Sequence, residues 1–371
     1  MDARRLALWR MHTMRLAGPP CETPEDAVGS LVAVQAQDFI PAQWSVAMRS
    51  RAAAGAALER LFAEGRILRT HLLRPTWHFV LPADIRWLLL LTAPRVQASN
   101  AYRQRQLELD EKLLARADTL LVSVLEGGSQ LTRARLSAVL SAAGINTEGQ
   151  RMAYILMHAE LNGLICSGAP QGRQQTYALL DERAPGARTL ARDEALAELT
   201  LRYFTGHGPA TAKDFRWWSS LTLNDIGNGL EAVGSHLEQE SIDGLTYWFA
   251  EPPPRRQAPS PTVQLVQGYD EYIVGYGESR LAVDLAGRAA SRIFSRPAYA
   301  GAVIVDGQIA GHWKQAINRG SIVLDVELYA PLDAAQVNAL HAAGDRYGGF
   351  LGLPASLTER PLRGASGLGL A

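Results

Sequence analysis

The sequence predicts an α+β protein of tandem winged-helix motifs, about three in number, with a strand-rich C-terminal region. Clusters of helical periodicity are each followed by a short pair of β-like segments, which is the element order of a winged helix. A strong hairpin pattern surrounds Asp306-Gly307 near the C-terminal end. The length of 371 residues fits two or three domains, at roughly 100–200 residues each.

Residues 1–127 form the first predicted region, a helical unit with winged-helix character. The pair Thr23-Pro24 is typical of a helix start, and helical periodicity then predicts a helix over 23–38. Residues 66–80 alternate in the manner of a strand and are rich in β-branched and aromatic side chains. A long helix rich in Arg, Gln and Leu is expected at about 95–126.

Two further regions, 128–190 and 191–258, each show a helix, a turn, a second helix and a β wing. In the first of them, Thr132 is expected to cap the leading helix, and Gly144 supplies the turn. In the second, the segment Leu245–Phe249 is the strand that follows the helices.

The last region, 259–371, is rich in predicted strands. Asp306-Gly307 lies between two alternating segments and predicts a tight hairpin. Residues Lys314–Ser321 form a second, polar hairpin tip, and a final helix is expected over about 332–350. The polar tip contains Arg319, and a solvent-exposed loop without a function is an equally good interpretation of it.

Composition excludes several classes of protein. Hydrophobic residues make up 47% of the chain and charged residues 20%, as in ordinary globular proteins. The two cysteines, Cys21 and Cys166, are too few for a disulfide framework or a Cys₄ zinc site. No apolar run approaches the ~20 residues that a membrane span needs, and no signal peptide opens the chain. We therefore expect a cytoplasmic protein with no membrane partner.

The formal net charge of +0 argues mildly against a nucleic-acid partner, but the basic residues are unevenly distributed. All but three of the 37 basic residues are arginines, which bind phosphate in a bidentate manner. Genomic base composition explains that bias equally well. Six arginines against two glutamates between positions 49 and 74 predict a basic face in the N-terminal quarter. The expected DNA contacts from this cluster and the polar tip are Arg49, Arg51, Arg69, Arg74, Lys314 and Arg319.

The most unusual motif is Gln35-Ala36-Gln37-Asp38, within the first region. If the chain extends there, positions 35 and 37 project to the same side, so that two amides converge on one spot. An amide cannot take a proton at neutral pH, but it can hold a water molecule and place partial negative charge beside a developing cation. The alternative is that the amides satisfy the free carbonyl groups of a helix end, or bind only solvent.

Other ionisable groups give weaker signals. His78 ends a strand-like segment beside Trp77 and is either a supporting group of a site or a structural hydrogen-bonding residue. Asp270 and Glu271 are either working carboxylates or structural partners of arginines. Zinc-ligand spacing, a phosphate-binding glycine loop and a serine nucleophile elbow are all missing from the sequence. We predict neither a metal nor a cofactor.

Five segments together resemble the winged-helix DNA glycosylases of the AlkZ/YcaQ group, and they run in family order from residue 34 to residue 313. These segments are Val34-Gln35-Ala36-Gln37-Asp38, Leu73-Arg74-Pro75-Thr76-Trp77-His78, His207-Gly208-Pro209-Ala210-Thr211 with Trp217-Trp218, Tyr269-Asp270-Glu271-Tyr272-Ile273-Val274-Gly275-Tyr276, and Val305-Asp306-Gly307 with Gly311-His312-Trp313.

The resemblance implies tandem winged helices in a C-shaped arrangement with a concave surface for double-stranded DNA. It implies excision of N7-alkylated purines and unhooking of interstrand crosslinks by a monofunctional glycosylase, which we expect to be a nucleoid-associated monomer. The Gln-x-Gln form is similar to the AlkZ subgroup, which protects producers of DNA-crosslinking antibiotics such as azinomycin B. By this resemblance Gln35 and Gln37 are the catalytic residues.

The chemistry explains how two glutamines could suffice. A purine alkylated at N7 already carries a positive charge, which its departure neutralises, so no general acid is needed. Two amide oxygens could then position a water molecule and stabilise the sugar cation. We expect Gln37 to position the water, Gln35 to assist and Asp38 to be structural, although its carboxylate would be the better base.

Two other functions remain open at this point. Winged helices usually bind DNA without chemistry, so the main alternative is a regulator or a protein that sequesters damaged DNA. A weaker alternative is a drug-binding protein, given eight tryptophans and eleven tyrosines. The Gln-Ala-Gln motif favours the enzyme, because a regulator has no need of it.

Overall fold

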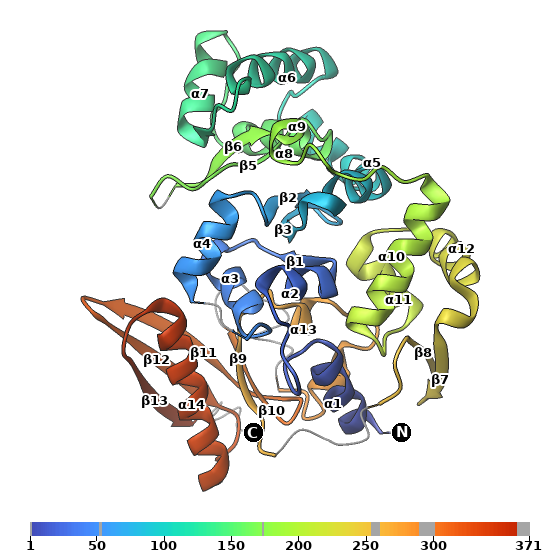
Figure 1. Cartoon of the computed structure of the whole chain (residues 1–371), viewed down its shortest axis with the longest axis vertical. Coiled ribbons are helices and arrows are strands. Elements are labelled where there is room, and N and C mark those ends of the chain that lie inside the picture. Colours follow the sequence, from blue (N-terminus) through green and yellow to red (C-terminus); the bar gives the residue numbers. More distant parts are fainter. Residues whose placement is uncertain (1, 52–53, 173, 254–259, 289–300, 362–371) are drawn as a thin grey trace, which may run out of the picture.

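The computed structural model describes residues 2–51, 54–172, 174–253, 260–288 and 301–361. It confirms a mixed architecture of helices and strands (Figure 1). The described strands form sheets in the orders β1-β3-β2, β4-β6-β5, β7-β8 and β13-β12-β11-β10-β9.

The N-terminal part surrounds the three-stranded sheet β1-β3-β2. Its elements are α1 (Ala3–Thr13), α2 (Pro24–Leu31), β1 (Ala33–Gln35), α3 (Phe39–Ala47), α4 (Gly55–Ala63), β2 (Leu68–Leu72) and β3 (Thr76–Val80). Thr23 forms the predicted cap, in a capping box with Asp26. The helix expected over 23–38 is too long, because Val32 adopts a positive φ of 66° and turns the chain into β1. The segment 66–80 is a hairpin of two strands rather than one strand.

The second unit packs around its own hydrophobic core. Its elements are α6 (Glu111–Leu125), β4 (Leu131–Thr132), α7 (Arg133–Ala142), α8 (Arg151–Leu161), β5 (Ile165–Ser167), β6 (Thr176–Leu179) and α9 (Leu180–Arg183). Thr132 caps α7 as predicted. The single helix expected at 95–126 is in fact α5 (Pro82–Gln106) followed by α6, because Asp110 caps a new helix. Helix α6 packs with this second unit, although the boundary predicted at 127 assigns it to the first.

The third unit is also helical with a terminal β ribbon. Its elements are α10 (Arg192–His207), α11 (Ala212–Ser219), α12 (Leu223–Val233), the short η1 (Gly234–His236), β7 (Glu238–Ile242) and β8 (Leu245–Phe249). Thr211 and Thr222 each begin a helix with a capping box. Trp218 is fully buried, whereas its neighbour Trp217 is exposed.

The C-terminal part contains the largest sheet. Its elements are β9 (Val263–Val266), α13 (Glu271–Val274), η2 (Arg280–Val283), β10 (Gly301–Val305), β11 (Gln308–Asn318), β12 (Ser321–Leu328), α14 (Ala334–Leu351) and β13 (Ala355–Pro361). Asp306 and Gly307 both have positive φ values, as the predicted tight turn requires. Strand β11 continues to Asn318, so the polar tip expected over 314–321 is reduced to a turn at 319–320. Strand β13, which was not predicted, pairs in parallel with β12.

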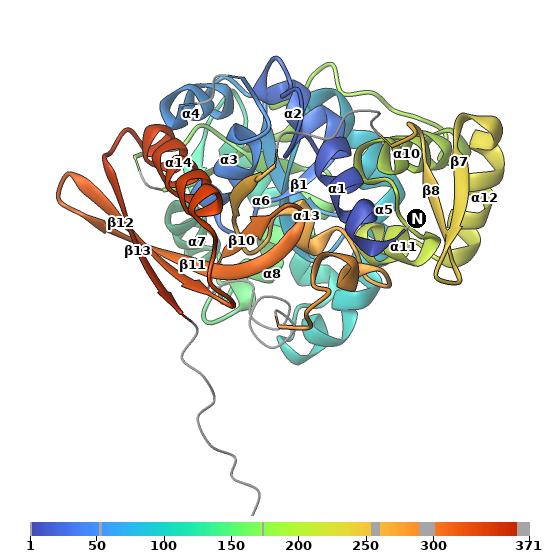
Figure 2. The same ribbon diagram turned by 90° about the horizontal axis from the view of Figure 1, so that it is seen from below.

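One large core joins the N-terminal and C-terminal parts across the sequence. Trp44 of α3 packs edge-on against Tyr347 of α14 and donates a hydrogen bond to the Leu265 carbonyl of β9 at 2.7 Å. The β11–β12 hairpin extends away from this body in both views (Figures 1 and 2). Within the described ranges, no helix combines the length and apolarity that a membrane crossing requires.

Candidate functional site

The first glutamine of the motif lies at the end of β1, an edge strand that pairs on one side with β3. Gln35 is directly opposite His78 of β3, which in turn is opposite Thr70 of β2. Residues that face each other across antiparallel strands project to the same side of the sheet, so these three side chains share one face. The Ala36 amide donates to the Trp77 carbonyl at 2.7 Å, which continues the pairing one residue beyond β1.

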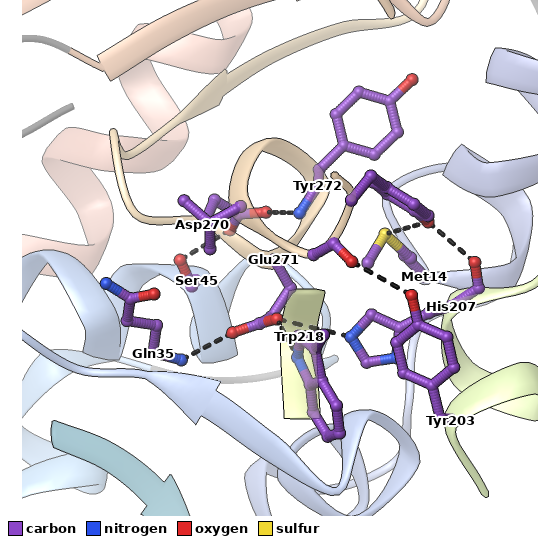
Figure 3. Close-up of polar contacts among 12 residues, drawn as sticks. Met14, Gln35, Ser45, Tyr203, His207, Trp218, Asp270, Glu271 and Tyr272 are labelled. Carbon is purple, nitrogen blue, oxygen red and sulfur yellow. Dashed lines mark hydrogen bonds and ion pairs between the residues drawn. The ribbon is translucent and has the colours of Figure 1, made fainter. Parts of the chain in front are cut away.

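Gln35 is only 5% exposed and is fixed at two points. Its backbone N–H donates to Oε1 of Glu271 at 2.7 Å. Its side-chain oxygen accepts a hydrogen bond from Nη2 of Arg74 at 2.6 Å. Figure 3 shows the side-chain amide of Gln35 directed away from the Glu271 carboxylate. The backbone and the side chain of Gln35 therefore have separate partners.

Glu271 is a fully buried carboxylate at the start of α13. Besides the Gln35 amide, it accepts hydrogen bonds from Nε1 of Trp218 at 2.8 Å and from Nε2 of His207 at 3.4 Å (Figure 3). Burial alone would raise the pKa of Glu271, but the hydrogen bond and charge of His207 and the charge of Arg74 lower it to about 2. A permanent negative charge thus lies directly behind β1.

The other two residues of the motif leave the sheet. Gln37 is partly buried, and Asp38 occupies the N-cap position of α3 without a side-chain capping bond. Partial burial raises the pKa of Asp38, and the nearby charge of Arg69 acts in the opposite direction. No side-chain hydrogen bond among the described residues supports the predicted structural role of Asp38.

His78 is fully buried and is held in one tautomer. Its Nδ1 lies 3.0 Å from the Thr76 carbonyl, which can only accept, so Nδ1 carries the proton. Burial and the charge of Arg74 lower the pKa of His78 to about 3. At neutral pH the imidazole is uncharged and presents Nε2 as an acceptor, so His78 cannot supply a proton to a leaving group.

Five buried polar atoms gather on this sheet and at its edge without a hydrogen-bond partner among the described residues. These atoms are Oε1 of Gln37, Oγ1 of Thr70, Oγ1 of Thr76, Nε1 of Trp77 and Nε2 of His78. Folded proteins leave few buried polar groups unpaired, and a local concentration of them marks a place for water or a substrate. The sheet β1-β3-β2 is therefore the best candidate site in the described part of the chain.

A groove of about 560 Å³ opens beside this sheet, toward the second unit. Arg69 and Trp77 line it from the sheet, and the start of α7 with the β6 edge lines it from the other side. The Arg69 guanidinium lies 4.3 Å from the Trp77 ring and donates to the carbonyl oxygens of Ala36 and Gln37 at 3.0 and 3.3 Å. One arginine thus connects the groove to the backbone of the glutamine motif.

The predicted DNA contacts divide into three groups. Arg49 is fully buried and forms a bidentate ion pair with Asp270 at 2.7 and 2.8 Å, so we correct its assignment: it is structural. Arg69 and Arg74 both contact the glutamine motif. The remaining three are Arg51, which is exposed and pairs with Glu22, and the exposed Lys314 and Arg319 of the β11–β12 hairpin.

Sequence reasoning missed the supporting role of Glu271. The acid was noted as one of two adjacent carboxylates, but its partner Gln35 is 236 residues away. Asp270 does pair with an arginine, as the structural interpretation predicted. Residues from the His207 and Trp218 segments reach the same carboxylate. The separate motifs of the sequence thus meet at one place.

Comparison with known proteins decides the family. A model of the DNA glycosylase AlkZ-like family matches residues 28–350. The chain belongs to the AlkZ-like DNA glycosylases. The family match confirms the prediction of a DNA glycosylase, and it favours an enzyme over a regulator or a drug-binding protein.

Comparisons of this AlkZ-like glycosylase with individual proteins support the same family. It is 25% identical over 360 residues to the interstrand DNA cross-link repair glycosylase of Streptomyces sahachiroi, covering 92% of this chain and 95% of that protein. The structure matches that of the DNA glycosylase AlkZ from the same organism with a TM-score of 0.77 at 23% identity. The match covers 96% of this chain and all of the other, so the two share a fold.

A metal centre has no support in the described part of this AlkZ-like glycosylase. No group of three His, Cys, Asp or Glu side chains there is arranged to hold a metal ion. The His207–Glu271 and His71–Glu160 contacts each join one imidazole to one carboxylate.

Proposed function

We propose that this glycosylase hydrolyses the N-glycosidic bond of N7-alkylated purines in double-stranded DNA and unhooks interstrand crosslinks. The observation that supports this most is the set of unpaired buried polar atoms on the sheet β1-β3-β2 and at its edge, which includes the side-chain oxygen of Gln37, together with the neutral state of His78 opposite Gln35. The name of the Streptomyces sahachiroi relative, an interstrand DNA cross-link repair glycosylase, supports the crosslink as a substrate.

Such a site suits a leaving group that needs no proton. The electron pair of the glycosidic bond neutralises the positive charge of an N7-alkylated purine, which therefore departs as a neutral base. What the enzyme must supply is a positioned water and an environment that tolerates a developing sugar cation. We assign the water to Gln37, whose side-chain oxygen is buried and unpaired among the described residues, with Gln35 assisting and the neutral His78 in support.

Three winged-helix units arranged around a concave DNA surface are part of the proposal. The order of helix, strand, two helices and hairpin in the second unit, with sheet order β4-β6-β5, supports one of them. The regions 1–127, 128–190, 191–258 and 259–371 remain our proposed division, with α6 moved to the second unit. We propose a monomer that works on nucleoid DNA and serves in self-resistance to DNA-crosslinking antibiotics.

The β11–β12 hairpin is the proposed probe of the DNA minor groove. A bulky crosslink cannot be swung into a tight pocket as a single base can, so an open site with a projecting hairpin suits it better. Lys314 and Arg319 are both exposed on this hairpin, and Figure 1 shows it extending from the body. Deleting the tip of the hairpin, residues 315–321, should slow crosslink unhooking; an unchanged rate would contradict this role.

The decisive experiment uses N7-methylguanine DNA and a crosslinked duplex, followed by alkali to reveal abasic sites. The wild-type protein should release the alkylated base, with no effect of a chelator. Gln37→Ala and Gln35→Ala should lose most activity, and Asp38→Ala should retain it. If only the aspartate variant is inactive, the assignment of roles is wrong. DNA binding without base release by the wild type would leave a non-catalytic binding protein.

A further inference from the structure

The contact between Arg74 and Gln35 fixes which end of the amide faces the site. Nη2 of Arg74 lies 2.6 Å from the side-chain oxygen of Gln35. A guanidinium has only donors, so the amide atom that meets it must be the oxygen, whichever way the side chain is drawn. The oxygen of Gln35 is thus engaged, and only its NH₂ group remains for another partner.

Arg74 is itself held in place. It lies in the tight turn between β2 and β3, where Leu73 has a positive φ of 62° although it is a bulky residue. Its Nη1 donates to the Val274 carbonyl at 3.3 Å, at the end of α13. The charge of Glu271 lies nearby and balances that of the guanidinium. The turn therefore places the guanidinium of Arg74, whose charge is compensated by Glu271, against the side-chain oxygen of Gln35.

The two glutamines consequently differ in what they offer. No partner of the Gln35 NH₂ group lies among the described residues, and the oxygen of Gln37 is a buried, unpaired acceptor. Gln35 can therefore donate and Gln37 can accept. This replaces the sequence-based expectation that two amide oxygens act together on the sugar cation.

We propose that Arg74 is a positioning residue that fixes Gln35 as a hydrogen-bond donor to the departing purine, while Gln37 accepts from the attacking water. This inference rests on the proposed function. The C1′–N9 bond breaks with its electron pair going to the cationic purine, which leaves as a neutral base. The water oxygen bonds to C1′, and its proton is lost to solvent. A donor on the purine stabilises the electron density that arrives there.

The variant Gln35→Glu tests the donor directly. Glutamate keeps the shape and the oxygen that meets Arg74, but it replaces the NH₂ group by a second oxygen. The single-turnover rate of N7-methylguanine release at pH 8 should fall by about 10²-fold, the cost of removing one preorganised donor. The rate should stay low between pH 8 and pH 5, because the adjacent Arg74 guanidinium keeps the introduced carboxyl group ionised over this range. A rate at pH 8 equal to or above wild type would overturn the proposal.

The variant Gln37→Glu is the matched comparison, because it adds the same charge two residues away while keeping an acceptor. Gln35→Glu should be slower than Gln37→Glu by at least about tenfold. Equal losses would show that the site merely rejects negative charge, which would also overturn the assignment.

The variant Arg74→Met tests the positioning role, with Arg66→Met as a matched control that removes an exposed arginine paired with Glu25. Arg74→Met should slow the saturated single-turnover rate by about tenfold or more, with Arg74→Lys between it and wild type. A weaker DNA affinity and a salt slope reduced by about one, at an unchanged saturated rate, would identify Arg74 as a phosphate contact and refute the role. A wild-type protein that releases no alkylated base would overturn both this inference and the proposed function.

Discussion

Replacing Glu271 by glutamine tests whether the buried carboxylate behind β1 stabilises the fold through its charge. The substitution keeps the side-chain volume and one oxygen. It removes the negative charge, and one of the donors that now meet the carboxylate (the Gln35 amide, Trp218 and His207) will face an NH₂ group instead. The fold should tolerate the change in shape but not the loss of charge.

The magnitude follows from the pKa of Glu271, which lies at about 2 against an ordinary value of 4.5. A difference of this size corresponds to about 3 kcal/mol in the free energy of unfolding. Because the folded-state pKa is lowered, the unfolded chain binds more protons between these two values. The stabilisation is therefore complete above pH 4.5 and is lost as the pH falls toward 2.

Urea unfolding of wild type and Glu271→Gln at two pH values measures the contribution of this charge to the free energy of unfolding. At pH 7 the variant should be less stable by about 3 kcal/mol, and at pH 3 the difference should narrow to about 1 kcal/mol. Glu22→Gln is the control, because Glu22 is exposed and pairs with the exposed Arg51; its effect should stay below about 0.5 kcal/mol. A wild-type-to-variant difference that is the same at both pH values would refute the reasoning.

Three further predictions concern packing and DNA contact. Arg49→Met should lower the free energy of unfolding by about 3–5 kcal/mol, because it leaves the buried Asp270 charge unpaired; a change below about 1 kcal/mol in urea unfolding would contradict the buried pair. Gly275→Ala should lower the thermal midpoint, since its Cβ would lie 2.5 Å from the Glu271 carbonyl oxygen; an unchanged midpoint would contradict that close approach. Arg319→Ala should reduce the salt slope of DNA binding by about one if it meets a phosphate, as fluorescence anisotropy at several salt concentrations would show.

Local sequence signals predicted the starts of many elements. Thr23 and Thr132 cap helices as expected, because a cap depends on residues only three positions away. Asp306-Gly307 forms its turn for the same reason. Local signals failed where distant packing decides: Val32 takes a strained backbone conformation that ends α2 early, so that β1 can pair with β3 some 45 residues later. The parallel pairing of β13 with β12 could not be predicted either, because distant packing decides it as well.

The functional residues show the same division. The Gln35–Gln37 pair could be found from the sequence, because its spacing and its chemistry are local. That Arg49 is buried, and that Arg74 binds Gln35 rather than standing free for DNA, could not be found in this way. An arginine in a sequence has the same charge whether it meets a phosphate or a buried carboxylate.

The sequence by itself determined the residue types available to the site: two amides, a histidine and a surplus of arginines, with the helix caps and hairpin turns that build the surrounding units. Only the tertiary structure decided what each group does. It brought Glu271, His207 and Trp218 to the back of β1 and left the oxygen of Gln37 unpaired among the described residues. The physical reason is that hydrogen-bond donation, acceptance and pKa depend on the nearest neighbours in space, which long-range packing supplies.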